Sequence, residues 1–275
     1  MRGADKMRVL SLFAGIGGFD LGLERTGGFE TVAFCEIDPF CQRVLAKHWP
    51  NVPCYPDVKE LTNERLAADG IAVDVICGGF PCQDLSVAGR RAGIEGERSG
   101  LWSEFFRLIC ELRPRFVLVE NVGGLLAGPS ELPGTWFGKV LGDLASIRYD
   151  AEWDCIPAAA VGAPHLRDRV WVMAYPEQVE WFRPVFNADY ASETVRRNAT
   201  IGLQNGLRSE VGAALRSIPG QWLDQPDPVR VAYGVSDWSH RLAALGNAVV
   251  PQIPELIGRA ILASTAATDA MERNG

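Results

Sequence analysis

Short apolar runs rich in Val, Ile and Phe recur along the chain and are bounded by polar residues, glycine or proline. Runs of this length and composition are typical of buried β-strands. They predict strands at Arg8–Phe13, Glu30–Glu36, Val73–Cys77, Phe116–Val122 and Arg169–Ala174, with a shorter run at Val52–Tyr55.

Segments with helical spacing of apolar residues lie between several of these runs, at Pro39–Trp49, Leu101–Leu112 and Trp136–Ser146. Pro39 suits the first position of a helix, where its missing N–H costs no hydrogen bond. Strands that alternate with helices favour a parallel sheet covered on both faces. We therefore expect an α/β fold with a doubly wound, mostly parallel sheet.

The alternation stops after Tyr175. Residues 176–240 mix aromatic residues, arginines, glycines and prolines without a clear period, whereas the segment from Arg241 to about Met271 is apolar and helical again. We expect a small separate lobe at 176–240 and a large domain built from 1–175 together with 241–275.

The composition is typical of a folded globular protein. With 275 residues, 47% of them hydrophobic, the chain can bury the cores of one large and one small domain. A net charge of -7 does not favour broad contact with phosphates, although a few arginines in one cleft can still hold a nucleic acid.

Cysteine spacing and hydropathy bear on the compartment. The seven cysteines show no zinc-type or CxxC spacing, which favours reduced thiols in the cytoplasm and no metal site. The N-terminus has no sustained apolar stretch, and no later segment reaches the roughly 20 apolar residues that span a bilayer. We expect no export and no membrane segment.

A glycine-rich turn, Phe13–Asp20, follows the first strand and favours close approach of a ligand to the backbone. Glu36 ends the second strand about 20 residues further on, where nucleotide-binding sheets use an acid to hold ribose hydroxyls. Asp57 follows the next short run and could accept from an adenine amino group. These features predict a nucleoside ligand; a plain tight turn with two ordinary polar acids is the alternative.

Cys82 lies in the segment Gly-Phe-Pro-Cys-Gln, residues 79–83, directly after the predicted strand Val73–Cys77. A thiolate is the strongest nucleophile among protein side chains, and a strand end followed by a turn presents it to solvent. Cys82 is therefore the candidate nucleophile, against the alternative of a small buried hydrophobe.

Polar residues also end the predicted strand Phe116–Val122. Glu120 and Asn121 come to the same carboxyl edge of the sheet as Cys82. A carboxylate beside a buried strand is costly unless it is paired, which points to a function. A salt-bridged or capped glutamate at a strand exit is the structural alternative.

A basic segment precedes the last predicted strand. Under strand alternation, Arg167 and Arg169 point to one face, where two cations could hold an anion. A solvated charged edge is the alternative, and His165 by itself would be an ordinary polar residue.

Taken together and in order, these segments resemble the motifs of DNA cytosine-5 methyltransferases. The resemblance covers about 8–175 and 241–262, and rests on LFAGIGGFD at 12–20, Glu36, Asp57, GFPCQ at 79–83, ENV at 120–122, RDR at 167–169 and LGNAVVP at 245–251. It implies a Rossmann-like methyltransferase fold that binds S-adenosylmethionine and acts on double-stranded DNA, with a target-recognition lobe at 176–240.

The resemblance also implies site residues. Catalytic roles fall to Cys82, Glu120, Arg167 and Arg169. The cofactor is expected to lie among Phe13, Gly15, Ile16, Gly17, Gly18, Glu36, Ile37, Asp57, Val58, Pro81, Leu101 and Asn247. The substrate side is expected to hold Gln83, Ser86, Arg90, Arg91, Asn121 and His165.

The chemistry implied by the resemblance uses these side chains together. The Cys82 thiolate adds to C6 of cytosine, so that C5 can attack the sulfonium methyl. Protonated Glu120 donates to N3, which requires a raised pKa. Arg167 holds the O2 side of the base, and Arg169 supports Glu120. Because C6 is hidden in a stacked duplex, the base must be flipped out, and residues 84–100 are expected to close over it.

Two features depart from the family pattern. His165 stands where the family often has Gln, and the lobe at 176–240 is short and slightly acidic. We expect recognition of a short or loosely defined sequence by a monomer, with any cognate restriction endonuclease acting separately.

Three alternatives stay open. A dinucleotide oxidoreductase would share the sheet and Glu36, but it would not explain GFPCQ together with ENV. The chain could instead methylate transfer RNA, because relatives that do so use the same active site. A non-catalytic DNA-binding relative would keep the fold without the reaction, and only a working Cys82 would be trapped covalently by DNA that carries 5-fluorocytosine.

Overall fold

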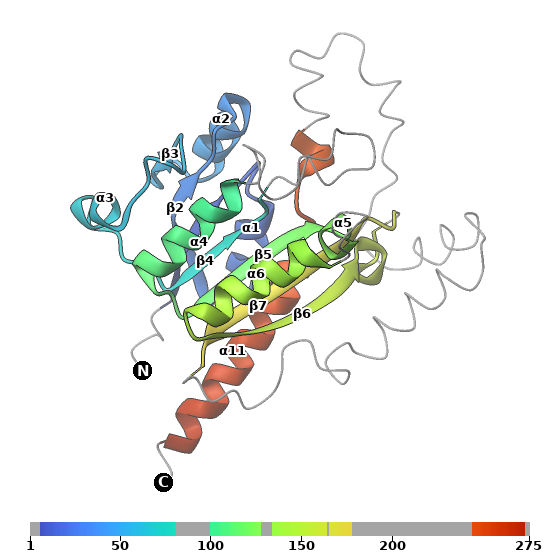
Figure 1. Cartoon of the computed structure of the whole chain (residues 1–275). Helices are drawn as coiled ribbons and strands as arrows, with labels where there is room; N and C mark the ends of the chain where they lie inside the picture. The colour runs from blue at the N-terminus through green and yellow to red at the C-terminus, as the bar shows by residue number, and fades with distance from the viewer. Residues whose placement is uncertain (1–5, 81–99, 128–133, 164, 178–243, 273–275) are drawn as a thin grey trace, which may run out of the picture.

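The computed structural model describes residues 6–80, 100–127, 134–163, 165–177 and 244–272, which form one sheet with helices on both faces (Figure 1). In the described part of the chain the sheet has seven strands in the order β3-β2-β1-β4-β5-β7-β6. The strands are β1 (Met7–Leu12), β2 (Phe29–Cys35), β3 (Cys54–Tyr55), β4 (Val75–Gly78), β5 (Phe116–Val122), β6 (Tyr149–Pro157) and β7 (Asp168–Pro176).

Strands β1 to β5 pair in parallel, whereas β7 is antiparallel to β5 and β6 is antiparallel to β7. The expected doubly wound, mostly parallel α/β fold is therefore confirmed. The strand order reverses between β1 and β4, and sheets of this kind bind ligands outside the carboxyl ends of the strands at such a reversal.

Alternating side chains of the strands feed two apolar cores, one on each face. On one face α4 (Gly100–Leu112) and α6 (Thr135–Ser146) pack over the core that holds Leu10 and Val117. On the other face α1 (Gly18–Arg25) and α11 (Gln252–Glu272) pack over the core that holds Val9 and Phe116. Neighbouring residues of β1 and of β5 thus enter opposite cores, which is why the runs Val9–Leu10 and Phe116–Val119 are apolar without alternation.

The shorter helices are α2 (Pro39–His48), α3 (Asn63–Ala68), α5 (Gly124–Ala127) and a 3-10 turn at Ala158–Val161, and residues 244–247 are also helical. In α2 the side chain of Asp38 accepts a hydrogen bond from the Phe40 N–H, and Pro39 occupies the first turn as the sequence predicts. No helix in the described residues is long and apolar enough to cross a membrane.

Two elements differ from the expectations. Strand β6 was not predicted, because it lies at the edge of the sheet with much of its side-chain surface exposed and lacks a continuous apolar run. The antiparallel direction of β7 was also not predicted, since an apolar run carries no information on strand direction. The expected lobe at 176–240 lies almost wholly outside the described residues, so its boundaries remain predictions.

Candidate functional site

The predicted site residues gather at the carboxyl edge of the sheet. Strand β4 leads into Gly79 and Phe80, and Glu120 and Asn121 are the last residues of β5 before its end at Val122. Because β7 runs antiparallel, it is the beginning of β7 that reaches this edge, where Arg169 pairs in register with Val122. The reversed strand therefore brings the basic segment to the acid.

Glu120 is buried, with 9% of its surface exposed. Its Oε1 lies 3.0 Å from Nε of Arg169. On the other side, a Cβ added to Gly79 would lie 2.8 Å from Oε2, so only glycine leaves room for this carboxyl position. Burial raises the pKa of Glu120, while the positive charges of Arg169 and Arg167 act in the opposite direction. The raised pKa is the direction that a proton donor requires.

Asn121 uses its side chain within the protein. It is 3% exposed, its Nδ2 donates to the Phe80 carbonyl at 3.1 Å, and its Oδ1 accepts from the Val122 N–H at 2.8 Å. The side chain therefore ties β5 to the backbone that leads towards residue 82. Sequence reasoning placed Asn121 on the substrate side and missed this tether, as it missed the role of Gly79.

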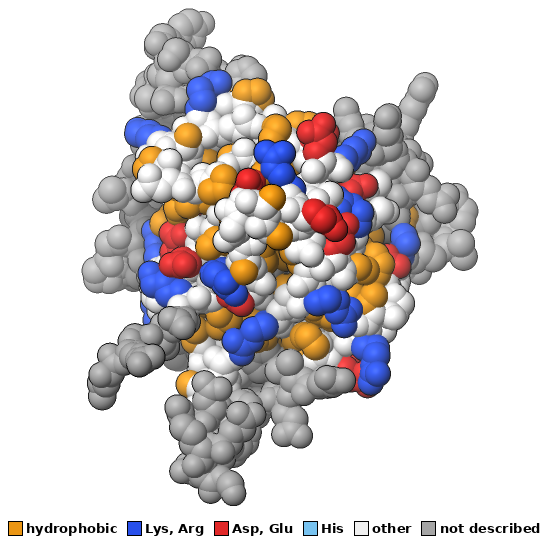
Figure 2. All heavy atoms as spheres, turned by 90° about the vertical axis from the view of Figure 1, so that its left-hand side faces the viewer, with side chains coloured by type: hydrophobic (Ala, Val, Ile, Leu, Met, Phe, Trp, Pro, Cys, Tyr) orange, Lys and Arg blue, Asp and Glu red, His pale blue; other side chains and the backbone are white. Residues whose placement is uncertain are grey.

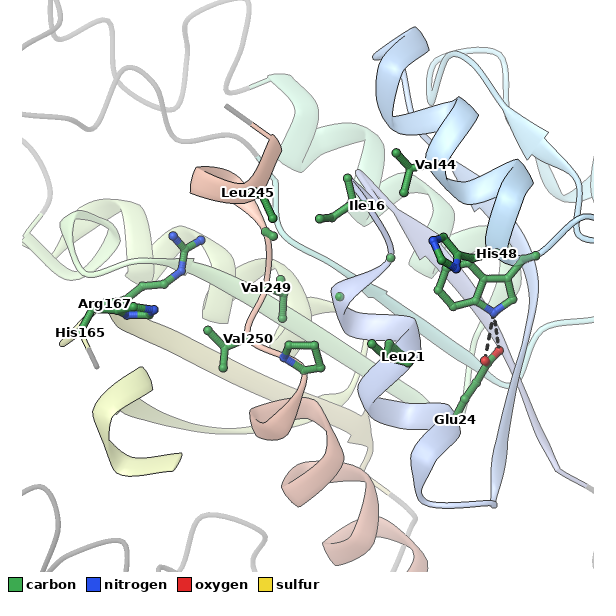
Figure 3. Close-up of a pocket in the computed structure, with 15 residues that line it drawn as sticks. Ile16, Leu21, Glu24, Val44, His48, His165, Arg167, Leu245, Val249 and Val250 are labelled. Carbon is green, nitrogen blue, oxygen red and sulfur yellow. Dashed lines mark hydrogen bonds between the residues drawn. The ribbon is translucent and has the colours of Figure 1, made fainter. Parts of the chain in front are cut away.

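Arg167 and His165 lie at one end of a cavity of about 640 Å³. Figure 3 shows them across from Ile16 and Val44, with Leu245 and Val249 between. The guanidinium of Arg167 donates to the carbonyl of Gly246, so the segment before α11 closes one side of the cavity. Burial lowers the pKa of His165, and the nearby Arg167 charge adds to this effect.

The expected common face of the two arginines needs correction. Arg167 precedes β7 and has a φ of 35°, in the left-handed region, so strand alternation does not extend to it. Arg169 instead pairs with Glu120, and Arg167 contacts Gly246. Both charges nonetheless act on Glu120.

Glu36 stabilises the glycine-rich turn by hydrogen bonding. It is 8% exposed, its Oε2 accepts from the Gly15 N–H at 2.7 Å, and its Oε1 accepts from the Asp38 N–H at 2.8 Å. A carboxylate has about four acceptor positions, so two are left for a ligand. The Glu36 side chain therefore links the segment that follows β1 to the segment that follows β2.

The glycines of the turn serve different purposes. A side chain at Gly15 would meet nothing within 4 Å, and its φ of +56° favours glycine. In contrast, an added Cβ at Gly17 would lie 2.6 Å from the Trp49 ring, and one at Gly18 would lie 2.4 Å from the Val249 carbonyl. Packing within the protein thus explains Gly17 and Gly18, and open space for a ligand remains only beside Gly15 among these three.

Most of the other residues expected near the cofactor lie in the described part of the chain. Phe13 stacks against Phe105 with ring centroids 6.4 Å apart, Ile37 is 73% exposed, and Val58 is buried. Asp57 accepts a hydrogen bond from the Lys59 N–H. Leu101 is the second residue of α4 and is half-buried, Asn247 is exposed, and Ile16 lines the cavity of Figure 3. The sheet order β3-β2-β1-β4 places the carboxyl ends of β1, β2 and β3 side by side. Phe13, Ile37 and Val58 follow these three strand ends along the chain.

Several predicted site residues lie outside the described residues: Pro81, Cys82, Gln83, Ser86, Arg90 and Arg91. On the face that carries α2, β3 and α3, Figure 2 shows basic and acidic side chains interspersed among apolar ones. This face does not form a single cationic surface, in keeping with the net charge of -7.

The comparison with family models matches residues 7–225 to the family described as C-5 cytosine-specific DNA methylase. The chain is 38% identical over 172 residues to the type II methyltransferase M2.BsuMI of Bacillus subtilis (strain 168), across 61% of this chain and 42% of that protein. It is 34% identical over 188 residues to the type II methyltransferase M.Sau3AI of Staphylococcus aureus, across 64% of this chain and 45% of that protein.

Among solved structures, the chain is similar to an E. coli protein described as a DNA modification methyltransferase encoded within a prophage. The TM-score is 0.55 and the identity 28%, across 65% of this chain and 49% of that one. The matched region spans less than half of the length of each of these relatives.

Proposed function

Because the chain belongs to the C-5 cytosine-specific DNA methylase family, we propose that it transfers the methyl group of S-adenosylmethionine to C5 of a cytosine in double-stranded DNA. The carboxyl of Glu120 carries this proposal: it is buried between Gly79 and Arg169, and burial raises its pKa. An acid that keeps its proton in a closed site can donate to N3 of the base as negative charge develops on the ring.

The nucleophile in this proposal is Cys82. Its thiolate adds to C6 of the flipped base, and the C5–C6 electron pair becomes available to attack the methyl group. Loss of the C5 proton and elimination of the thiolate then restore the aromatic ring. The tether from Asn121 to the Phe80 carbonyl supports this assignment, because it holds the backbone two residues before Cys82 against the strand that carries Glu120.

Arg167 is proposed to contact O2 of the base. Its donation to the Gly246 carbonyl leaves other guanidinium N–H groups for a second acceptor. His165 lines the same cavity and is proposed to lie beside the base. Arg169 is proposed to hold the Glu120 carboxyl in place rather than to touch the substrate.

The residues around the glycine-rich turn fit S-adenosylmethionine, which when bound supplies an electrophilic methyl group. Gly15 offers open space beside the backbone, and Ile37 offers an exposed apolar side chain for the adenine ring. Glu36 keeps acceptor positions for ribose hydroxyls beyond the two used by the backbone. We propose that Asp57 accepts from the adenine amino group.

Methyl-labelled S-adenosylmethionine tests the proposal directly. The protein and a Cys82→Ala variant would each be incubated with unmethylated duplex DNA and, separately, with bulk transfer RNA. The expected result is 5-methylcytosine in DNA only, absent with the variant. Label in RNA would assign the reaction to RNA instead. Failure to label either substrate, together with no covalent complex on 5-fluorocytosine DNA, would favour a non-catalytic relative.

A further inference from the structure

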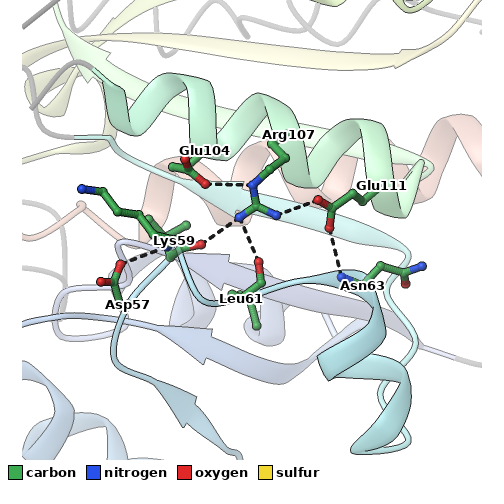
Figure 4. A network of polar contacts seen from close by, with 8 residues as sticks. Asp57, Lys59, Leu61, Asn63, Glu104, Arg107 and Glu111 are labelled. Carbon is green, nitrogen blue, oxygen red and sulfur yellow. Dashed lines mark hydrogen bonds and ion pairs between the residues drawn. The ribbon is translucent and has the colours of Figure 1, made fainter. Parts of the chain in front are cut away.

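Arg107 lies on α4, outside the residues assigned above, and ties that helix to the turn after β3. Its Nη2 donates to the carbonyl oxygens of Val58 and Leu61 at 3.0 and 2.9 Å. Figure 4 shows the guanidinium lying between α4 and this turn. Two carbonyls on the turn are therefore held by one side chain from a distant helix.

Two carboxylates of α4 orient the guanidinium. Its Nε lies 2.8 Å from Oε2 of Glu104, and its Nη1 lies 2.7 Å from Oε1 of Glu111. These residues stand three positions before and four positions after Arg107, which places all three on one face of the helix. With both sides of the planar fork engaged, the remaining edge is directed at the turn.

The turn that Arg107 holds is the one that carries Asp57. Within the turn, the Glu60 N–H donates to the Asp57 carbonyl, the Leu61 N–H donates to the Val58 carbonyl, and the Asp57 Oδ1 accepts from the Lys59 N–H. These bonds shape the turn but do not connect it to the rest of the fold. Glu111 adds a second tie, because its Oε2 accepts from the Asn63 N–H at 3.0 Å. The position of the turn relative to the sheet edge thus depends on α4.

We propose that Arg107 is a positioning residue for S-adenosylmethionine: it holds the turn so that the Asp57 carboxylate stands where it can accept from the adenine amino group. The inference rests on the proposed function. Arg107 also links two walls of the proposed cofactor site, since α4 begins beside Leu101 and the turn carries Asp57 and Val58. Its own guanidinium is engaged by the protein and does not need to touch the cofactor.

The test is the affinity of the whole 275-residue chain for S-adenosylhomocysteine, measured by calorimetry. Arg107→Met keeps the apolar stem and removes all four hydrogen bonds, whereas Arg107→Lys keeps the charge. We expect affinity to fall by about 10-fold in the methionine variant and by about 3-fold in the lysine variant. Only the two bonds to the Val58 and Leu61 carbonyls act on the turn, and loss of one or two hydrogen bonds produces effects of this size. The rate at saturating cofactor should stay within about twofold of the wild type.

Arg259→Met is the matched control, because it removes an Arg–Glu pair with the same i,i+4 type of spacing on α11. It should leave cofactor affinity unchanged. Thermal unfolding of every variant shows whether the fold is intact. If Arg107→Met does not fold, Arg107→Lys and Glu111→Gln carry the test, with weaker cofactor binding expected in both.

A double-mutant cycle with Asp57→Ala separates positioning from a general loss of structure. If Arg107 acts through Asp57, the Arg107→Met effect should shrink to less than about twofold in the Asp57→Ala background. An effect of undiminished size there, or wild-type affinity in the single variants, would overturn the inference. A wild-type protein that binds no S-adenosylhomocysteine would instead count against the proposed function.

Discussion

Two buried glutamates stand at the same edge of the sheet, with nearly equal exposure and different surroundings. Glu36 is 8% exposed and accepts two backbone N–H groups, whereas Glu120 is 9% exposed, pairs with Arg169 and lies against Gly79. The two backbone donors fix the Glu36 side chain, which links the segment after β1 to the segment after β2. Burial raises the pKa of Glu120 against the opposing charge of Arg169, which is the direction that the proposed proton donor requires. Their partners, more than their exposure, distinguish the two acids.

Glu120→Gln should produce the largest effect, because it removes the proposed proton donor and leaves Arg169 without its carboxylate. Methyl transfer should fall by about 10²- to 10⁴-fold, the range for loss of a general acid. Single-turnover rates with labelled cofactor measure this loss. Cofactor affinity should stay within about twofold, and a parallel loss of affinity would remove the distinction between the two glutamates.

Asp20 extends the comparison to a buried carboxyl with no ion pair among the described contacts. It accepts hydrogen bonds from Ser11 and Thr31, and burial raises its pKa to about 7. A raised pKa means that the folded state disfavours the charged form, so the stability contribution is complete at low pH and is lost as pH rises from about 4 to 7.

Asp20→Asn cannot titrate and removes this dependence. Between pH 5 and 8 the wild type should lose about 3 kcal/mol of unfolding free energy relative to the variant, as follows from linkage. Urea unfolding at both pH values measures the difference. If the difference in unfolding free energy between the wild type and the variant does not change with pH, Asp20 is not protonated in the folded state.

Glu36→Ala should weaken cofactor binding by about 1–3 kcal/mol, the usual range for lost charge-assisted hydrogen bonds. It should also destabilise the fold, since the N–H groups of Gly15 and Asp38 lose their acceptor. Calorimetry with S-adenosylhomocysteine and urea unfolding separate the two effects. Unchanged affinity would leave Glu36 with a structural role alone.

Gly79→Ala should have the smallest effect. The new Cβ would stand 2.8 Å from Oε2 of Glu120, so the carboxyl must shift. We expect methyl transfer to slow by about 10-fold at unchanged cofactor affinity, because small displacements of catalytic groups are costly. Gly142→Ala on α6, where an added Cβ also meets nothing within 4 Å, is the matched control. Equal rates in both variants would mean that the carboxyl adapts freely.

Much of the fold followed from local patterns. The predicted strand Phe116–Val122 has the bounds of β5, and Pro39 begins α2. These elements were readable because burial on both faces of a strand, or on one face of a helix, leaves its period in the chain. Strand β6 was missed because an exposed edge strand has no such requirement.

The site was only partly readable in this way. The ordered motifs predicted the family, which is confirmed, whereas the roles of the individual site residues stay predictions. The glycine-rich turn showed that side chains are excluded there, but the reason at Gly17 and Gly18 is contact with Trp49 and Val249, which lie far away in the sequence.

Local patterns in the chain were enough to predict which residues are buried in strands and helices, and which chemical groups stand at the strand ends. Which of those groups meet depends on the packing of distant segments. The antiparallel entry of β7 brings Arg169 to Glu120, and the approach of α4 brings Arg107 to the turn that carries Asp57. The physical reason is that periodicity reflects the environment of each residue, whereas the partner across a sheet or helix interface depends on direction and register between distant segments.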